Sequence, residues 1–125
     1  MAFNKTVIIV DDKPVIGRMV TMALKGLAVD CVYHSNPIKC IKWLNDNPIP
    51  DLIITDLRMP SMSGNKFVQY LKESERYKDI PIMVVSSEEA PEDKIDLYGK
   101  GALHYLVKPC NPADLRSRVV SVINL

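Results

Sequence analysis

The sequence has no strong excess of charge and no apolar run long enough to span a membrane. Its 125 residues carry 16 Lys and Arg against 15 Asp and Glu, a formal net charge of +1. A near-neutral balance argues against nucleic-acid binding, which generally needs a basic surface. The N-terminal segment "MAFNKTVIIVDD" is too short and too soon charged for a signal peptide. We therefore expect a cytoplasmic protein with no membrane or nucleic-acid partner.

Cysteine is scarce, and its positions do not have the spacing of a metal site. Cys31, Cys40 and Cys110 are an odd number of widely separated residues, which predicts reduced thiols, some of them in the core. Internal repeats and low-complexity segments are also absent. Hydrophobic residues make up 47% of the chain, enough for one core at this length. Residues 1–125 are therefore expected to form a single domain.

The sequence is rich in one pattern, the alternation of short β-branched runs with helical apolar periodicity. The expected strands are 6–10, 29–35, 51–56, 80–87 and 102–107. The expected helices are 14–26, 36–46, 63–74, 89–100 and a last one that starts at Pro112, with Asn111 as its cap. Strands separated by helices imply right-handed parallel crossovers. The sequence thus predicts an α/β fold, a doubly wound five-stranded parallel sheet with five helices.

The helical segments carry their apolar residues on one side, which identifies the faces expected to be buried. The second helix repeats Ile38, Ile41 and Leu44, and the last helix presents Leu115, Val119 and Val122. Segment 29–35 has mixed faces, so we expect it near an edge of the sheet.

Charged or hydroxyl side chains close four of the five expected strands. The first strand is followed by Asp11 and Asp12, the third ends at Asp56, the fourth ends at Ser86 and Ser87, and the fifth is followed by Lys108. Ligands of open α/β sheets bind outside the carboxyl ends of the strands. We therefore expect three carboxylates, a hydroxyl and an ammonium group to converge at one edge of the sheet.

Such a cluster favours phosphoryl chemistry with a metal ion. Crowded carboxylates repel one another, and Lys108 balances only part of their charge. Mg²⁺ prefers oxygen ligands and binds through one or two carboxylates plus phosphate oxygens. The sequence therefore predicts Mg²⁺ at Asp11, Asp12 and Asp56, with Lys108 and the Ser86 hydroxyl suited to hold phosphoryl oxygens. Asp56 can itself be the nucleophile, because carboxylates form aspartyl-phosphates.

These motifs together resemble the receiver domain of bacterial response regulators, and the length resembles the stand-alone chemotaxis type. The motifs are "VDD" at 10–12, "DLRMP" at 56–60 with Gly64, "SS" at 86–87, "GA" at 101–102, Tyr105, and "KP" at 108–109. They span essentially the whole chain in the expected order and spacing.

The resemblance implies a flavodoxin-like fold with strand order 2-1-3-4-5 and a role in a two-component system or phosphorelay. Asp56 would accept a phosphoryl group from the phosphohistidine of a histidine kinase or phosphotransfer protein. Asp11, Asp12, Asp56 and the backbone carbonyl of Arg58 would hold Mg²⁺. The chain would be no enzyme beyond catalysing its own phosphorylation and dephosphorylation.

The resemblance also implies a two-state switch, in which the phosphoryl group shifts the population of loop arrangements. Lys108 would bridge to the phosphoryl oxygen, Ser86 would hydrogen-bond it, and Tyr105 would then rotate inward. A cis peptide bond would precede Pro109. The downstream partner would bind the face around Tyr98, Lys100, His104 and Tyr105. Arg58 and Glu88 flank the route of the attacking water and would tune the phosphoryl lifetime.

Other interpretations of the same residues stay open. Asp11 and Asp12 can cap the first helix, Ser86 can be a turn residue, and Tyr105 can be ordinary packing. At the level of function, one alternative is a phosphorylation-independent interaction domain on the same fold. Another is a phosphatase of the haloacid-dehalogenase type, although such enzymes need an acid where Arg58 stands. A stand-alone regulator and the receiver part of a longer one both fit.

Overall fold

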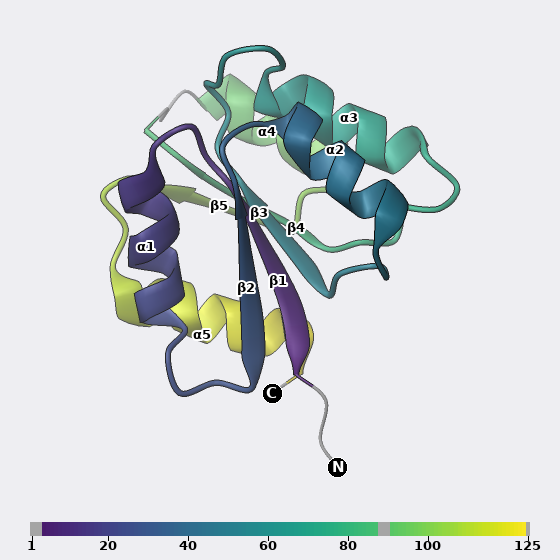
Figure 1. The fold of residues 1–125 in the computed structure, drawn as a ribbon. Coiled ribbons are helices and arrows are strands. Elements are labelled where there is room, and N and C mark those ends of the chain that lie inside the picture. The colour runs from purple at the N-terminus through teal and green to yellow at the C-terminus, as the bar shows by residue number, and fades with distance from the viewer. Residues whose placement is uncertain (1–3, 88–90, 125) are drawn as a thin grey trace.

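Five strands alternate with five helices in the computed structural model, which describes residues 4–87 and 91–124 (Figure 1). The strands are β1 (Lys5–Val10), β2 (Val29–His34), β3 (Leu52–Thr55), β4 (Ile82–Ser86) and β5 (His104–Val107). The helices are α1 (Pro14–Ala23), α2 (Pro37–Asp46), α3 (Gly64–Glu73), α4 (Pro91–Gly99) and α5 (Pro112–Ile123). All strand pairs are parallel, in the order β2-β1-β3-β4-β5. The predicted flavodoxin-like fold and strand order are confirmed.

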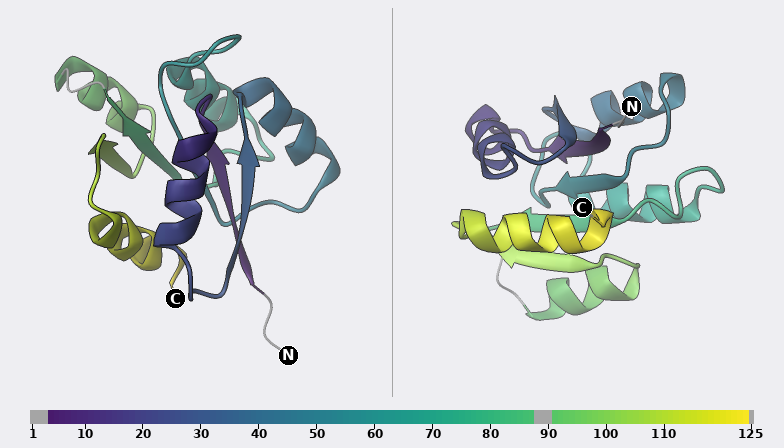
Figure 2. Two further views of the ribbon diagram at one scale, coloured as in Figure 1. Left: turned by 60° about the vertical axis from the view of Figure 1, so that its left-hand side comes forward. Right: turned by 90° about the horizontal axis from the view of Figure 1, so that it is seen from below.

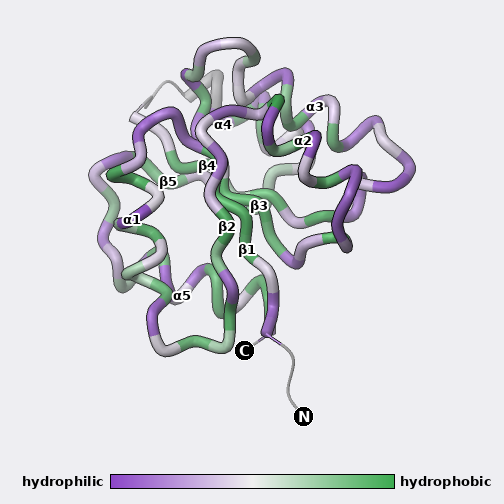
Figure 3. The backbone as a smooth tube through the Cα atoms, in the orientation of Figure 1, coloured by the Kyte–Doolittle hydropathy of each residue, from purple (hydrophilic) through white to green (hydrophobic). Residues whose placement is uncertain are grey.

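Helices cover both faces of the sheet and create two hydrophobic layers. Helices α1 and α5 lie on one face, and α2, α3 and α4 lie on the other (Figures 1 and 2). Because side chains alternate along a strand, Ile8 and Val10 pack on the α2–α4 side while Val7 and Ile9 pack on the α1–α5 side. Hydrophobic residues are accordingly concentrated along the central strands (Figure 3). No helix in the described ranges is both long and apolar enough to cross a membrane.

The position of a strand in the sheet decides how deeply its residues are buried. All four residues of β3 are buried, whereas β2 at the edge has only half-buried and exposed residues. The expectation that segment 29–35 lies at an edge is therefore confirmed. The acidic residues Asp11 and Asp56 directly follow β1 and β3, so they are attached to well-buried strands.

The helix starts follow the sequence signals at α2 and α5. The side-chain oxygen of Asn36 accepts a hydrogen bond from the Lys39 backbone N–H at 3.0 Å. That of Asn111 accepts from the Ala113 N–H at 2.8 Å, as its predicted cap role requires. Helix α1 differs, because its N-cap is Lys13 and no side chain caps it. The alternative in which Asp11 or Asp12 serves to cap α1 is therefore wrong.

Two sequence expectations about helices need correction. Helix α1 ends at Ala23 rather than at 26, and the chain then turns through Gly26, whose φ is +90°. In α2 the buried side chains are Pro37, Cys40 and Leu44, whereas Ile38 is 39% exposed. Each helical residue is rotated by about 100° from the one before it, so Ile38 cannot share the inward face of Pro37.

Candidate functional site

Three carboxylates converge at the carboxyl edge of the sheet. Val10 of β1 lies opposite Thr55 of β3, so the residues that follow them are neighbours. The backbone N–H of Asp56 donates to the carbonyl of Val10 at 3.0 Å. One carboxylate oxygen from each of Asp11, Asp12 and Asp56 lies within 4.8 Å of the others. The register of two central strands thus produces the acidic cluster that the sequence predicted.

Lys108 lies in contact with two of these acids. Its Nζ donates to Asp11 Oδ2 at 2.7 Å and to Asp56 Oδ2 at 3.2 Å. Its backbone N–H donates to the carbonyl of Ser86 at 2.8 Å, which fixes the end of β5 against β4. The Lys108–Pro109 peptide bond is cis, as the resemblance implied. The ammonium group therefore comes from a different strand and meets the acids from the side of β4 and β5.

Burial and charge act in opposite directions on this ion pair. Burial raises the pKa of the Asp11 carboxyl more than its hydrogen bonds with Lys108 and Lys13 lower it. Burial alone lowers the pKa of Lys108, but its hydrogen bonds with Asp11 and Asp56 and their charges outweigh that effect and raise the pKa. Lys108 therefore stays protonated, and it offsets only part of the charge of three carboxylates.

The acidic cluster fits a hard divalent cation. Asp11 Oδ1 accepts from the Lys13 N–H at 2.9 Å, and Asp56 Oδ1 accepts from the Leu57 N–H at 2.7 Å. Among the described residues, Asp12 Oδ1 is a buried acceptor with no hydrogen-bond partner. A buried oxygen without a donor is costly, and a cation ligated by carboxylates removes that cost. The donor set and the orphaned oxygen both suit Mg²⁺.

Gly64 and Tyr33 support the acids, although the sequence alone predicted no such role for either residue. A Cβ on Gly64 would overlap the carbonyl oxygen of Asp56, so the start of α3 packs directly on the backbone of Asp56. The hydroxyl of Tyr33 in β2 donates to the Asp11 carbonyl at 2.6 Å. A Cβ on Gly17 of α1 would come within 2.6 Å of the Tyr33 ring. A glycine inside an apolar helical stripe is the sequence signal that pointed to this close packing.

Ser86 and Tyr105 are both buried in the described structure. Ser86 closes β4 and has no exposed surface, and Tyr105 in β5 is 6% exposed. The Tyr105 side chain therefore lies inward in this structure. Arg58 lies in the β3–α3 loop with an exposed side chain. Glu88 lies outside the described residues, so the pairing of Arg58 with Glu88 stays a prediction.

Only some residues of the predicted partner face, around α4 and β5, are exposed. Tyr98 is 46% exposed, together with its neighbours Ile95 at 72% and Leu103 at 52%. Lys100 pairs with Asp96 of α4 at 2.9 Å, and Nδ1 of His104 lies 3.1 Å from Arg118 Nη1 of α5. Tyr105 is the exception, because its side chain is buried. The expectation that Tyr105 belongs to the exposed face is therefore wrong, because its side chain lies beneath that face.

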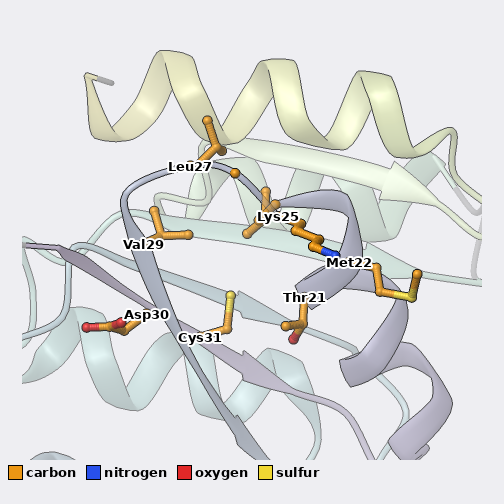
Figure 4. A pocket seen from close by; sticks show the side chains of 9 residues that line it. Thr21, Met22, Lys25, Leu27, Val29, Asp30 and Cys31 are labelled. Carbon is orange, nitrogen blue, oxygen red and sulfur yellow. The ribbon is translucent and has the colours of Figure 1, made fainter.

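A hollow of about 420 Å³ lies away from these charges, between the end of α1 and β2 (Figure 4). Val29 and Cys31 point toward α1 there, whereas Asp30 points to the other side of the strand. No predicted site residue lines this hollow. The three cysteines are free thiols, as predicted, and Cys40 is buried in the core. The acidic cluster at the carboxyl edge of the sheet and this hollow are thus separate places on the molecule.

The fold and the site together define a class of protein. A parallel 2-1-3-4-5 sheet with an aspartate cluster and a lysine at its carboxyl edge is typical of phosphoacceptor signalling modules. Residues 7–120 match the family model of the response regulator receiver domain. The chain belongs to this family and is a signalling module of the two-component class. Receiver domains generally bind Mg²⁺ through such an acidic cluster and interact with histidine kinases or phosphotransfer proteins.

Known proteins similar to the chain agree with this assignment. The phosphate regulon transcriptional regulatory protein PhoB of Pseudomonas aeruginosa is 33% identical over 120 residues, which are 96% of this chain and 52% of PhoB. The sensor histidine kinase TmoS of Ectopseudomonas mendocina is 34% identical over 121 residues, 95% of this chain and 12% of TmoS. The chain thus spans about half the length of the PhoB regulators.

Solved structures show the same fold. The chemotaxis response regulator CheY4 of Vibrio cholerae superimposes with a TM-score of 0.85 at 30% identity, covering 95% of this chain and 98% of CheY4. A putative response regulator from Chloroflexus aurantiacus J-10-fl gives a TM-score of 0.89 at 24% identity, covering 98% and 99% of the two chains.

Proposed function

We propose that Asp56 is the phosphoryl acceptor. Asp11, Asp12 and Lys108 assist the transfer of the phosphoryl group to it. The observation that carries this proposal is the contact of the buried Asp56 carboxylate with Lys108 Nζ at 3.2 Å, beside Asp11 and Asp12. The carboxylate of Asp56 can act as a nucleophile, and the neighbouring ammonium group of Lys108 can bind the transferred phosphoryl group.

The transfer moves a phosphoryl group from nitrogen to oxygen. A carboxylate oxygen of Asp56 forms the new bond to phosphorus as the bond to the donor imidazole breaks, and the electron pair returns to the imidazole, which is left neutral. The Leu57 N–H holds Asp56 Oδ1 at 2.7 Å and so orients the carboxylate. Lys108 and the Ser86 hydroxyl then bind phosphoryl oxygens. Positioning and charge neutralisation are most of what phosphoryl transfer requires.

Asp11, Asp12 and Asp56 would hold Mg²⁺, with the backbone carbonyl of Arg58 as a further ligand. The ion, when bound, neutralises charge on the phosphoryl oxygens. Around it, this chain's residues keep the acids in place: Tyr33 fixes the backbone of Asp11, and Gly64 fixes that of Asp56. We further propose that the chain acts on no external substrate, that it works in the cytoplasm, and that a downstream protein binds the α4–β5 face.

Mass spectrometry of the intact protein tests the proposal. We expect one added phosphoryl group after incubation with acetyl phosphate and Mg²⁺, and none with Asp56→Asn. The matched control is Asp46→Asn, which alters an exposed acid at the end of α2 and should be phosphorylated normally. Equal phosphorylation of the Asp56→Asn variant would disprove the assignment.

The alternative, phosphorylation-independent partner binding, differs from the proposed switch in whether a phosphoryl group changes the partner face. A pull-down with and without beryllofluoride, a phosphoryl mimic, separates the two functions. A partner captured only with the mimic supports the switch, whereas equal capture supports the alternative.

A further inference from the structure

We propose that Lys94 and Tyr98 are positioning residues that hold Tyr105 inward before the domain is phosphorylated. These two residues of α4 are called the α4 pair. The inference rests on the proposed switch at Asp56 and names the contacts that set its resting state. The inward state of Tyr105 would then already be the more populated one in the unphosphorylated domain. Phosphorylation would raise its population further.

The first contact ties α4 to the edge of the sheet. Strand β5 is an edge strand, so part of its backbone has no neighbouring strand to bond with. The Lys108 N–H donates to Ser86 in β4, and since N–H groups alternate in direction along a strand, that of Tyr105 points away from β4. The Tyr98 hydroxyl accepts from this N–H at 3.1 Å. The Tyr98 side chain of α4 thus satisfies the backbone N–H of Tyr105, the residue that moves in the proposed switch.

The second contact covers the Tyr105 ring. Lys94 Nζ lies 5.5 Å from the ring centroid, within the range of a cation–π interaction. Lys94 is half-buried, and Tyr105 is 6% exposed. An ammonium group over the ring face favours the inward position, because an outward ring loses this contact. The two members of the α4 pair therefore hold the backbone and the ring of the same residue.

Weak contacts are sufficient for such a bias. Each contact changes the ratio of inward to outward Tyr105 by about two- to fivefold. A phosphoryl group can shift the equilibrium only by its differential affinity for the two states. If the inward state is already favoured, the further change on phosphorylation is small. The α4 pair would thus set how strongly the partner face depends on phosphorylation.

Fluorine NMR of protein labelled with 3-fluorotyrosine measures this ratio directly. The Tyr105 signal is assigned by its loss in Tyr105→Phe. We expect the wild-type signal to move little when beryllofluoride and Mg²⁺ are added. In Lys94→Met, in Tyr98→Phe and most strongly in the double variant, the signal without the mimic should move toward a solvent-exposed position, and the mimic should restore it.

Two controls separate positioning from general damage. Lys94→Arg keeps a cation over the ring and should retain the wild-type signal. Lys100→Met removes a lysine near the end of the same helix that pairs with Asp96 instead, and it should leave Tyr105 unchanged. Thermal unfolding of each variant identifies any loss of fold. Because Lys94→Met and Tyr98→Phe remove chemically different contacts, the effect of each contact is measured separately.

The proposal is overturned if Tyr105 keeps its wild-type signal in the folded double variant, or if beryllofluoride moves the wild-type signal as far as it moves that of the double variant. The comparison without the mimic does not require Asp56 to react. A failure of Asp56 phosphorylation would therefore leave this result standing, and the two proposals can fail separately.

Discussion

The carboxyl edge at β1 and β3 differs sharply from the outer edge at β5 and α4. At the first, Asp11 and Asp56 are buried, directly follow well-packed strands and contact Lys108 at 2.7 and 3.2 Å. At the second, the half-exposed Tyr98 and the half-buried Lys94 make single contacts with Tyr105. The comparison teaches that the acidic site is held by short, buried contacts of opposite charge, while Tyr105 is held from α4 by single, weaker contacts near the surface.

Removing the half-buried Lys108 ammonium group, which contacts two buried carboxylates, should give the largest effect. Lys108→Met leaves Asp11 and Asp56 without their counter-charge, and breaking a buried ion pair costs about 3–5 kcal/mol of the free energy of unfolding. Urea unfolding in EDTA measures this loss, and Mg²⁺ should recover part of it. Lys5→Met is the control, because the Lys5–Asp51 pair is exposed, at 3.9 Å. Equal losses in both variants would remove the contrast between buried and exposed charge.

The next largest effect is expected at Gly64. Gly64→Ala places a methyl group against the backbone of Asp56 and Leu57, and such overpacking costs about 1–3 kcal/mol or more. Gly99→Ala is a matched control, since a methyl group there would meet nothing within 4 Å apart from its own helix backbone and chain neighbours. Urea unfolding should show a loss only for Gly64→Ala, together with slower phosphorylation. A normal phosphorylation rate in that variant would contradict the role of Gly64 in placing Asp56.

Mg²⁺ should stabilise the native protein through the acidic cluster. At ten times its dissociation constant, a ligand specific for the native state adds about 1.4 kcal/mol to the free energy of unfolding. We expect this gain in the wild type and not in Asp12→Asn at the same Mg²⁺ concentration. Thermal unfolding with and without Mg²⁺ checks it, with Asp46→Asn as control. An unchanged gain in Asp12→Asn would exclude that carboxylate as a ligand.

The smallest expected effect is a difference in alkylation rate between the buried thiol and the two half-buried ones. Burial raises the pKa of Cys40 to about 12. The reactive thiolate is then about one part in ten thousand at pH 8, and access is blocked as well. Cys31 and Cys110 are half-buried, and burial raises their pKa less far. Timed alkylation at pH 8 should modify Cys40 last, and modification of Cys40 first would contradict the packing of α2.

The sequence was sufficient for the fold and for the acidic cluster because both depend on local signals. Alternating strand and helix patterns fix the order of the elements, and the parallel sheet brings Asp11, Asp56 and Lys108 to one edge. Neither outcome requires knowledge of a side-chain conformation. The same reasoning failed for Ile38, because apolar spacing alone does not fix which way a short helix is rotated against the sheet.

Contacts between distant elements could not be foreseen from the sequence. The bond from Tyr33 to the Asp11 carbonyl depends on the close approach of α1 at Gly17. The two contacts of Tyr105 with α4, from the Tyr98 hydroxyl and the Lys94 ammonium group, likewise join separate elements. Both features arise from tertiary packing, which local periodicity does not encode.

The most direct measurement is the location of the phosphoryl group after reaction with acetyl phosphate. Borohydride reduction of an aspartyl-phosphate marks the residue, which peptide mass spectrometry then identifies. We expect a single mark at Asp56, formed with Mg²⁺ and lost in EDTA. A mark on another residue, or equal labelling of Asp56 without a divalent ion, would contradict the claim that these acids, a metal ion and Lys108 form one phosphoryl site.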